Sequence, residues 1–591
     1  MLNIIKGESG SGKTTYITDL LANMVKNGEK NILYIVPDQS SFDTQRTFLD
    51  LLGPKDSLNI NVQGFTGLCD YIFSVNGSSG KIPLDDGGKA IIMSLAIDEC
   101  QDNLPLFSHT KNKNELINLM LSAVSEYKTC NITSEKILET ASEIEDETLR
   151  TKLKETCLIR DTFDALVSES YVDPDDYITQ GYNSLLENNI FKDYIIALDS
   201  FSGFTNVELE FLSKLMVDAK DFYITVNTDS TNNKELFFTT ERTLNQLKKI
   251  ARDNDVKIAS PIVLADNHRF ETSELIPILK NVYRIEKTSL DQGTNNIILY
   301  ESKNKYTECD FVARNIRELI IDNDYTYQDI AVIYRQDNSY DGIIDSVFDK
   351  YNIPYFMDKE EDIFTKPLIK LVSSILETIN NSYQRENVLN ILKSGLMPFT
   401  SEEISLFENY ILMWDIKGSN FKNDFVDNPQ GLVSDFSDDD RKTLEIINKV
   451  RQGVINPLVD FQLKSKDTNA TTITKNLYNL LLNYNIPESI VSMCETLEES
   501  GNLPLSEEQR RLWEILMNIL DKMINLLSDK KLSLKEYTEL LMLQFNNSTI
   551  AFIPKAIDEV VVSGVERVRM PQKKAVFVIG CNEGIFPLFF F

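Results

Sequence analysis

Residues 2–15 read LNIIKGESGSGKTT, and this stretch decides the fold. Leu2 to Lys6 predicts a short buried strand, Gly7 to Gly12 predicts a turn, and the apolar residues that follow recur at helical spacing. The pattern G-x-x-x-x-G-K-[ST] between a strand and a helix is typical of a P-loop. Its glycines let backbone N–H groups turn inward around phosphate groups, at the positive end of the following helix. We therefore predict a nucleoside triphosphate site at the start of an α/β domain.

The predicted phosphate site gives a role to each polar side chain. Lys13 is expected to reach the β- and γ-phosphates, and the Thr14 hydroxyl is expected to bind Mg²⁺. Asp199 ends the apolar run YIIALD and is the candidate for a second Mg²⁺ contact, through a water molecule. The alternative for Asp199 is a strand-end aspartate that caps a turn. The predicted nucleotide-binding residues are Gly7, Glu8, Ser9, Gly10, Ser11, Gly12, Lys13, Thr14, Thr15 and Arg335.

We expect the chain to bind ATP without hydrolysing it efficiently, and we assign no catalytic residue. Motors that hydrolyse ATP generally carry a glutamate after the strand-end aspartate, and this chain has Ser200 there. Glu208 and Glu210 lie on the next predicted helix and are interpreted as its solvated face. Arg335 follows the run IAVIY and could reach the γ-phosphate across a domain cleft, although an ordinary surface arginine is an equally good interpretation.

The composition excludes several classes of site. The chain has 591 residues and a net charge of −30, which argues against a general polyanion binder but not against a local basic groove. Its seven cysteines are scattered without a C-x-x-C pair and it has two histidines, so we expect no cysteine or histidine metal centre within it. No apolar run reaches ~18 residues and no signal peptide is recognised, so we expect a cytoplasmic protein without a membrane contact.

Alternating strands and helices predict two parallel-sheet domains, each interrupted by a mostly helical insertion. The expected boundaries are 1–79 and 191–285 for the first domain, 80–190 for its insertion, 286–366 and 549–591 for the second domain, and 367–548 for its insertion. The predicted strands are Leu2 to Lys6, Asn31 to Pro37, Tyr194 to Asp199 and Phe222 to Asn227 in the first sheet, and Ile297 to Glu301, Ile330 to Tyr334, Val560 to Ser563 and Ala575 to Ile579 in the second. The second insertion contains an acidic loop around Asp435 to Asp440.

Two RecA-like domains with helical insertions, and a P-loop at the start, resemble superfamily 1 DNA helicases. Eight segments in order along the chain resemble one branch, the B subunit of the AddAB/RexAB helicase–nuclease. These segments are VPDQSSF (Val36 to Phe42), VQGFTGL (Val62 to Leu68), VSEYKTCNI (Val124 to Ile132), YVDPDDY (Tyr171 to Tyr177), LDSFSGFTNVE (Leu198 to Glu208), IAVIYR (Ile330 to Arg335), YNIPYFMD (Tyr351 to Asp358) and VFVIGCNEGIFP (Val576 to Pro587). A single short segment is weak, whereas eight in order are specific.

This resemblance implies partners and cofactors. The P-loop itself predicts ATP and Mg²⁺ as the cofactors. Family members form heterodimers with an A subunit that is the active motor, and they process double-strand DNA ends for recombinational repair. The B subunit resembles a helicase that has lost its motor function, and it guides DNA. Family members are longer than this chain and end in a nuclease with an iron–sulfur cluster. We therefore expect the second domain to be incomplete at Phe591, with the nuclease and its cluster beyond that residue.

Two other functions fit part of the pattern. An active helicase motor would share the fold, but Ser200 argues against it. So does the segment after FYITVN, which reads TDSTNNKELFF where motors keep a glutamine that senses the γ-phosphate. A small-substrate P-loop kinase would be much shorter and would not need a second α/β domain carrying IAVIYR.

Candidates for DNA contact are aromatic or basic. Aromatic candidates for base stacking are Phe65, Phe201, Phe204 and Tyr340, although most of the 31 phenylalanines and 23 tyrosines are expected in the core. Basic candidates for phosphate contact are Lys530, Lys531, Lys535, Arg567, Arg569, Lys573 and Lys574, and a solvated surface is the alternative for each of them.

Overall fold

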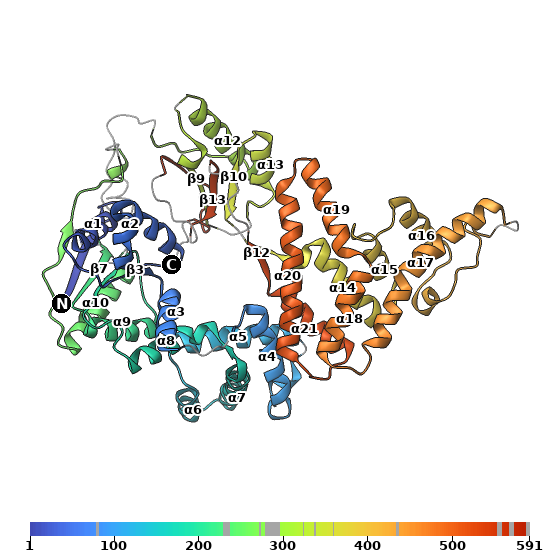
Figure 1. The fold of residues 1–591 in the computed structure, drawn as a ribbon, viewed down its shortest axis with the longest axis horizontal. Helices are drawn as coiled ribbons and strands as arrows, with labels where there is room; N and C mark the ends of the chain where they lie inside the picture. The colour runs from blue at the N-terminus through green and yellow to red at the C-terminus, as the bar shows by residue number, and fades with distance from the viewer. Residues whose placement is uncertain are drawn as a thin grey trace.

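The computed structural model shows two parallel sheets and a large helical body (Figure 1). It describes residues 1–77, 82–110, 112–228, 237–270, 274–277, 296–322, 324–335, 339–358, 360–432, 436–551, 558–565 and 573–586. The predicted α/β fold with parallel sheets and many helices is confirmed. No helix among these residues is long and apolar enough to cross a membrane.

The first sheet carries the P-loop. Its strands are β1 (Leu2–Gly7), β2 (Ile32–Ile35), β3 (Ile60–Gln63), β6 (Ile195–Leu198), β7 (Asp221–Asn227) and β8 (Ile262–Leu264). They lie in the order β3-β2-β6-β7-β1-β8, and every neighbouring pair is parallel. The strand β3 was missed by the sequence pattern, because its residues INVQ are few and alternate between buried and half-buried at the sheet edge.

Helices cover both faces of this sheet. They are α1 (Lys13–Lys26), α2 (Ser41–Asp56), α3 (Phe65–Asn76), α8 (Pro174–Glu187), α9 (Asn206–Asp218) and α10 (Phe238–Asp253). Successive strand residues point to opposite faces, so Ile5 joins the core under α1 and α2 whereas Ile4 joins the core under α3 and α9. Strands buried on both faces explain the near-continuous apolar runs in the sequence.

The second sheet is smaller and has the order β10-β13-β9-β14, again with parallel neighbours. Its strands are β9 (Ile330–Tyr334), β10 (Tyr355–Asp358), β13 (Val560–Gly564) and β14 (Ala575–Val578), and its helices are α12 (Lys305–Asp322) and α13 (Ile343–Lys350). The predicted pairing of the last strand beside Ile330 to Tyr334 is confirmed.

The prediction of a strand at Ile297 to Glu301 is wrong. These residues have no strand assignment, and the Leu299 side chain is 98% exposed. Tyr300 instead stacks on Phe311 of α12, with ring centroids 3.8 Å apart. An apolar run becomes a strand only where a neighbouring strand accepts its backbone hydrogen bonds, and this run pairs with no described strand.

The two insertions are almost entirely helical. The first contains α4 (Asp86–Cys100), α5 (Lys113–Thr129), α6 (Ser134–Glu143) and α7 (Glu147–Ser170), and its ends pair as the short parallel strands β4 (Ile82–Pro83) and β5 (Tyr171–Val172). The second contains α14 (Pro367–Asn380), α15 (Arg385–Leu392), α16 (Ser401–Met413), α17 (Asp438–Lys464), α18 (Ala470–Asn483), α19 (Ile486–Glu499), α20 (Leu503–Leu527) and α21 (Leu534–Asn546). Its ends pair as the antiparallel strands β11 (Glu360–Asp362) and β12 (Thr549–Ala551).

Part of the predicted acidic loop is a helix terminus. Asp438, Asp439 and Asp440 form the first turn of α17, and Asp440 closes a capping box with Ser437. Negative side chains stabilise this end of a helix because they face its free N–H groups and its positive dipole end. The preceding residue Asp435 lies outside the described residues.

Two of the eight segments that carry the family resemblance meet in an ion cluster between the first insertion and α8. The Lys128 ammonium lies 2.8, 2.7 and 2.6 Å from carboxylate oxygens of Asp164, Asp173 and Asp176. Burial opposes its charge, but these carboxylates outweigh burial and raise the pKa of Lys128. The cluster fixes α5 against the start of α8, which explains the lysine of VSEYKTCNI and the aspartates of YVDPDDY.

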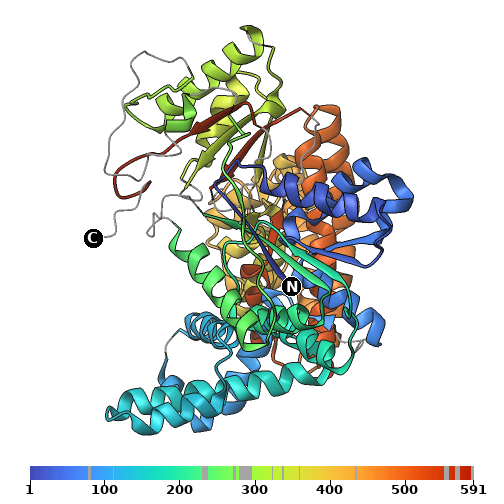
Figure 2. The same ribbon diagram turned by 90° about the vertical axis from the view of Figure 1, so that its left-hand side faces the viewer.

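The two insertions share one core, although they lie far apart in the sequence. A single apolar cluster includes Ile91 of α4, Leu516 of α20 and Leu541 of α21. Asp85 accepts hydrogen bonds from Lys522 at 2.6 Å and from Gln544 at 3.1 Å. Figure 1 shows blue α4 against orange α20 and α21, and Figure 2 shows the first insertion along the lower side of the molecule. The helices therefore form one body connected to both sheets.

We predict that Gly87→Ala weakens this shared core. A Cβ atom at Gly87 would lie 2.3–2.5 Å from the amide atoms of Gln544, which is fully buried. We expect a loss of about 1–3 kcal/mol in the free energy of unfolding, measured by urea denaturation. Gly203→Ala is the control, because its nearest atom would be 3.7 Å away. An alanine that fits should leave stability unchanged or raise it by ~0.4–1 kcal/mol, and the same result for Gly87→Ala would contradict the proposed close packing.

Candidate nucleotide-binding site

The P-loop joins β1 to the N-terminus of α1. Gly10 and Gly12 have φ values of 84° and 80°, in the left-handed region that glycine adopts without steric cost. The Ser11 N–H donates to the Glu8 carbonyl at 3.2 Å, which closes the turn. The helix α1 begins at Lys13, so its free N–H groups and positive dipole end lie at this turn. The geometry suits a bound phosphate chain.

Lys13 folds back over the turn. Its ammonium donates to the carbonyls of Gly7 at 3.0 Å and Glu8 at 2.8 Å. Burial lowers the pKa of Lys13 to about 8, the Arg269 charge contributes in the same direction, and Asp199 opposes it. The lysine is thus a partly desolvated cation beside the turn, and a phosphate anion would stabilise its charge.

Asp199 lies beside Thr14, as the sequence predicts. The Thr14 hydroxyl donates to Asp199 Oδ2 at 2.8 Å, and the Ser200 hydroxyl donates to the same oxygen at 3.0 Å. Only the strand β7 separates β6 from β1, so the ends of these strands lie close together at one edge of the sheet. A hydroxyl and a carboxylate are oxygen ligands of the kind that Mg²⁺ prefers, so these two residues fit a magnesium ion.

Sequence reasoning missed the residues that cover the P-loop. The segment after β8 places the Arg269 guanidinium 2.9 Å from Ser9 Oγ and the Asn267 amide 3.2 Å from the Ser9 carbonyl. The His268 N–H donates to the Gly10 carbonyl at 2.8 Å. The sequence signal for these residues is the polar run NHR, which follows the apolar run IVL of β8. The three residues of IVL are too few to predict a strand, so the polar run after it is not recognised as lying at the sheet edge.

Arg335 has a different neighbour. It follows β9, and its guanidinium lies 3.4 Å from the Ile585 carbonyl in the second domain. Among the described residues, Arg269 is the arginine that donates to Ser9 of the P-loop. A contact of Arg335 with the γ-phosphate stays a prediction.

The two glutamates after Ser200 have separate environments. Glu208 is half-buried, and its carboxylate accepts from the backbone N–H and the hydroxyl of Thr205 in the capping box of α9. The interpretation of Glu208 as a merely solvated residue is therefore wrong. Glu210 is exposed, in agreement with its predicted position, and accepts from the Asn131 side chain at 3.3 Å.

The aromatic candidates for DNA contact lie in the core or against it. Phe65 and Tyr340 are 4% and 3% exposed. Phe201 and Phe204 are half-buried and pack against Phe65, with ring centroids 5.8 and 6.2 Å from it. Because Phe65 and Tyr340 expose almost no ring surface, we do not assign base stacking to either of them.

The basic candidates for DNA contact lie in different parts of the chain. Lys530, Lys531 and Lys535 are exposed. Lys574 lies 2.9 Å from Asp329, and Lys573 donates to the Gln328 carbonyl, so both support the edge of the second sheet. Arg567 and Arg569 lie outside the described residues.

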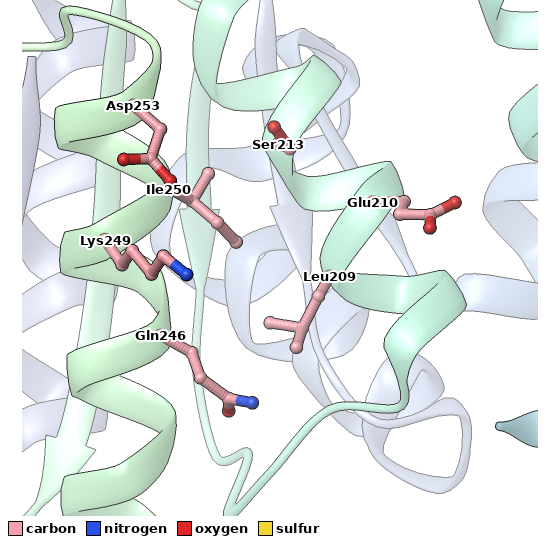
Figure 3. Close-up of a pocket in the computed structure, with 7 residues that line it drawn as sticks. All are labelled: Leu209, Glu210, Ser213, Gln246, Lys249, Ile250 and Asp253. Atoms are coloured by element: carbon pink, nitrogen blue, oxygen red, sulfur yellow. The ribbon is translucent and has the colours of Figure 1, made fainter. Parts of the chain in front are cut away.

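A shallow hollow of about 310 Å³ lies between α9 and α10 (Figure 3). It is lined by Leu209, Glu210, Ser213, Gln246, Lys249, Ile250 and Asp253. None of these residues is part of the P-loop, and Asp199 is not among them. The hollow therefore adds nothing to the phosphate site.

Comparisons with known proteins agree with this geometry. A family model described as UvrD-like helicase C-terminal domain matches residues 251–590. The chain belongs to this helicase family. A second model, described as ADDB, N-terminal, matches residues 4–279, so the two matches together cover both sheets.

Curated relatives confirm the resemblance to a B subunit. A protein of Clostridium novyi (strain NT) is 31% identical over 592 residues, which are 99% of this chain and 51% of the relative. Proteins of Clostridioides difficile (strain 630) and Clostridium acetobutylicum are 30% and 29% identical, each over 99% of this chain and 52% of the relative. All three are named as the B subunit of an ATP-dependent helicase/deoxyribonuclease. The chain spans about half the length of the curated relatives it matches.

We predict that nucleotide affinity depends on the charge of Lys13. The free protein loses the Lys13 proton as the pH rises through about 8, whereas a bound triphosphate should retain it. The affinity for a fluorescent ATP analogue should therefore be highest at pH values far below 8. It should fall above pH 8, by at most about tenfold per pH unit. Calorimetry in buffers of different ionisation enthalpy should detect proton uptake on binding near that pH.

Two variants of Lys13 control this experiment. Lys13→Arg stays charged throughout this range and should lose the pH dependence. Lys13→Ala should abolish binding without unfolding the protein. Unchanged affinity in folded Lys13→Ala would refute the role of the lysine.

We also predict that Arg269→Ala weakens binding of the ATP analogue about tenfold, because a hydrogen bond between charged groups contributes ~1.5–3 kcal/mol. Arg252→Ala is the control, since Arg252 is an exposed arginine in the last turn of α10. Equal affinity of the two variants would show that Arg269 does not reach the nucleotide.

Proposed function

We propose that the chain is the ATP- and Mg²⁺-binding, helicase-like part of a subunit that guides DNA in a helicase–nuclease, with little or no hydrolysis of its own. The observation that carries the binding proposal is the arrangement of Lys13, Thr14 and Asp199 around the P-loop. Backbone N–H groups, a lysine and an arginine would bind the phosphate chain. Thr14 and Asp199 would bind the magnesium ion, which neutralises phosphate charge.

The proposal of weak hydrolysis depends on Ser200. A water molecule that attacks a phosphate needs a carboxylate or amide beside it to orient it. Ser200 offers only a hydroxyl, which donates to Asp199. Glu208, the next glutamate along the chain, is engaged in capping α9 and so does not replace the missing carboxylate.

The names of the relatives support the proposal of a larger assembly. They describe the B subunit of a helicase/deoxyribonuclease, which implies a partner subunit in those proteins. For this chain we propose a cytoplasmic heterodimer with an AddA-like helicase–nuclease subunit that acts on double-strand DNA ends in repair. We assign the iron–sulfur cluster and nuclease to the part of the relatives that this chain does not match. Among the described residues, no group of three or more His, Cys, Asp or Glu side chains could hold a metal ion.

The alternative is an active helicase motor, which the UvrD-like fold would equally support. We predict that the chain, with DNA ends present, releases phosphate from ATP no faster than Lys13→Ala. Ser200→Glu should release phosphate slightly faster than the unmodified chain without reaching motor turnover, since no γ-phosphate-sensing glutamine is recognised after β7. A DNA-stimulated rate in the unmodified chain that is absent from Lys13→Ala would establish the motor instead.

A further inference from the structure

The Asp199 carboxylate is held by hydroxyl groups on both of its oxygens. Oδ2 accepts from Thr14 and Ser200, and Oδ1 accepts from Thr225. Asp199 and Thr225 are each 3% exposed. A buried carboxylate keeps a fixed orientation when donors are present on both oxygens, because rotation would leave a buried polar atom without a partner.

The sheet explains why Thr225 meets Asp199. Leu198 of β6 is in register with Ile224 of β7, so the next residues along the two parallel strands are Asp199 and Thr225. On its other side Thr225 is in register with Ile5 of β1. The surrounding core contains Ile5, Ile17 and Ala197, where an apolar valine would suit the packing. A buried hydroxyl among these residues is therefore explained by its bond to the aspartate.

Ser200 is exposed and donates to the other carboxylate oxygen, Oδ2. Its φ of 68° is in the left-handed region, which costs a residue with a Cβ atom about 1–2 kcal/mol. Its hydroxyl shares Oδ2 with Thr14, which is the predicted magnesium ligand. A water molecule of a magnesium shell would also need a lone pair of that oxygen.

We propose that Thr225 is a positioning residue that orients the Asp199 carboxylate toward Mg²⁺, and that the Ser200 hydroxyl competes with the water shell of the ion. This inference rests on the proposed nucleotide site. Thr225 holds Oδ1 from within the sheet, so Oδ2 faces Thr14 at the P-loop. Ser200 must release Oδ2 before a magnesium-bound water can donate to it.

The test measures the Mg²⁺ concentration at half-saturation in binding of a fluorescent ATP analogue, and separately its affinity in EDTA. Thr225→Val keeps the shape of the side chain but removes the hydroxyl, and it should raise this Mg²⁺ concentration about tenfold. Thr225→Ser restores a hydroxyl and should restore the value of the unmodified chain. Affinity in EDTA should stay within a factor of about two, because no phosphate contact is lost.

Two further variants distinguish positioning from general stability. Ser200→Ala removes the competing donor at an exposed position and should lower the Mg²⁺ concentration needed, by about threefold. Thr378→Val removes a fully buried hydroxyl in the helical body and should change nothing at the site. If Thr225→Val does not fold, the direction of the Ser200→Ala effect decides the proposal.

The outcomes separate two kinds of failure. If the unmodified chain binds no nucleotide even with Mg²⁺, the proposed function fails and this inference fails with it. If it binds nucleotide, but folded Thr225→Val and Ser200→Ala both need the same Mg²⁺ concentration as the unmodified chain, the positioning role is overturned and the binding site stands.

Discussion

The parallel alignment of β6, β7 and β1 is the constraint on which the nucleotide site depends. Because all three strands run in one direction, their carboxyl ends meet at one edge, where polar side chains can gather beside the apolar core. Asp199 directly follows β6 and Thr225 lies in β7, so this alignment brings them into contact, and Gly7 ends β1 at the same edge. Apolar packing on both faces keeps the strands in register. The Thr225 hydroxyl, which donates to Asp199, is therefore positioned by the core around it.

Much of the fold could be predicted because buried parallel strands carry continuous apolar runs, as in ILYI of β2 and IAVIY of β9. The failures occurred where local sequence does not determine pairing. The short edge strands β3 and β8 carry too few apolar residues to be recognised. The run at Ile297 to Glu301 has the composition of a strand, but hydrogen-bonding partners far along the chain decide whether it becomes one.

The candidate site likewise contains residues that local sequence predicts and residues that only long-range contacts bring there. Residues within the P-loop motif were predictable, because one local turn determines their positions. Asp199 was predictable because it ends an apolar strand. Arg269 was not, because its contact with Ser9 joins residues that are 260 positions apart. The burial of Tyr340 could not be predicted from local sequence either, because its hydroxyl donates to Glu308 on α12, 32 residues earlier in the chain.

The core shared by the two helical insertions also has a consequence during protein synthesis. Asp85 and its partner Gln544 are 459 residues apart, so the contact between α4 and α21 cannot form until α21 has been synthesised. At a synthesis rate of ~5–20 residues per second, this delay is on the order of 20–90 s. During that interval the surface of α4 that packs on α21 lacks this partner, next to a P-loop domain of which α1 and β2 have already left the ribosome. Chaperones that bind exposed apolar segments could act on this surface of α4 during the delay.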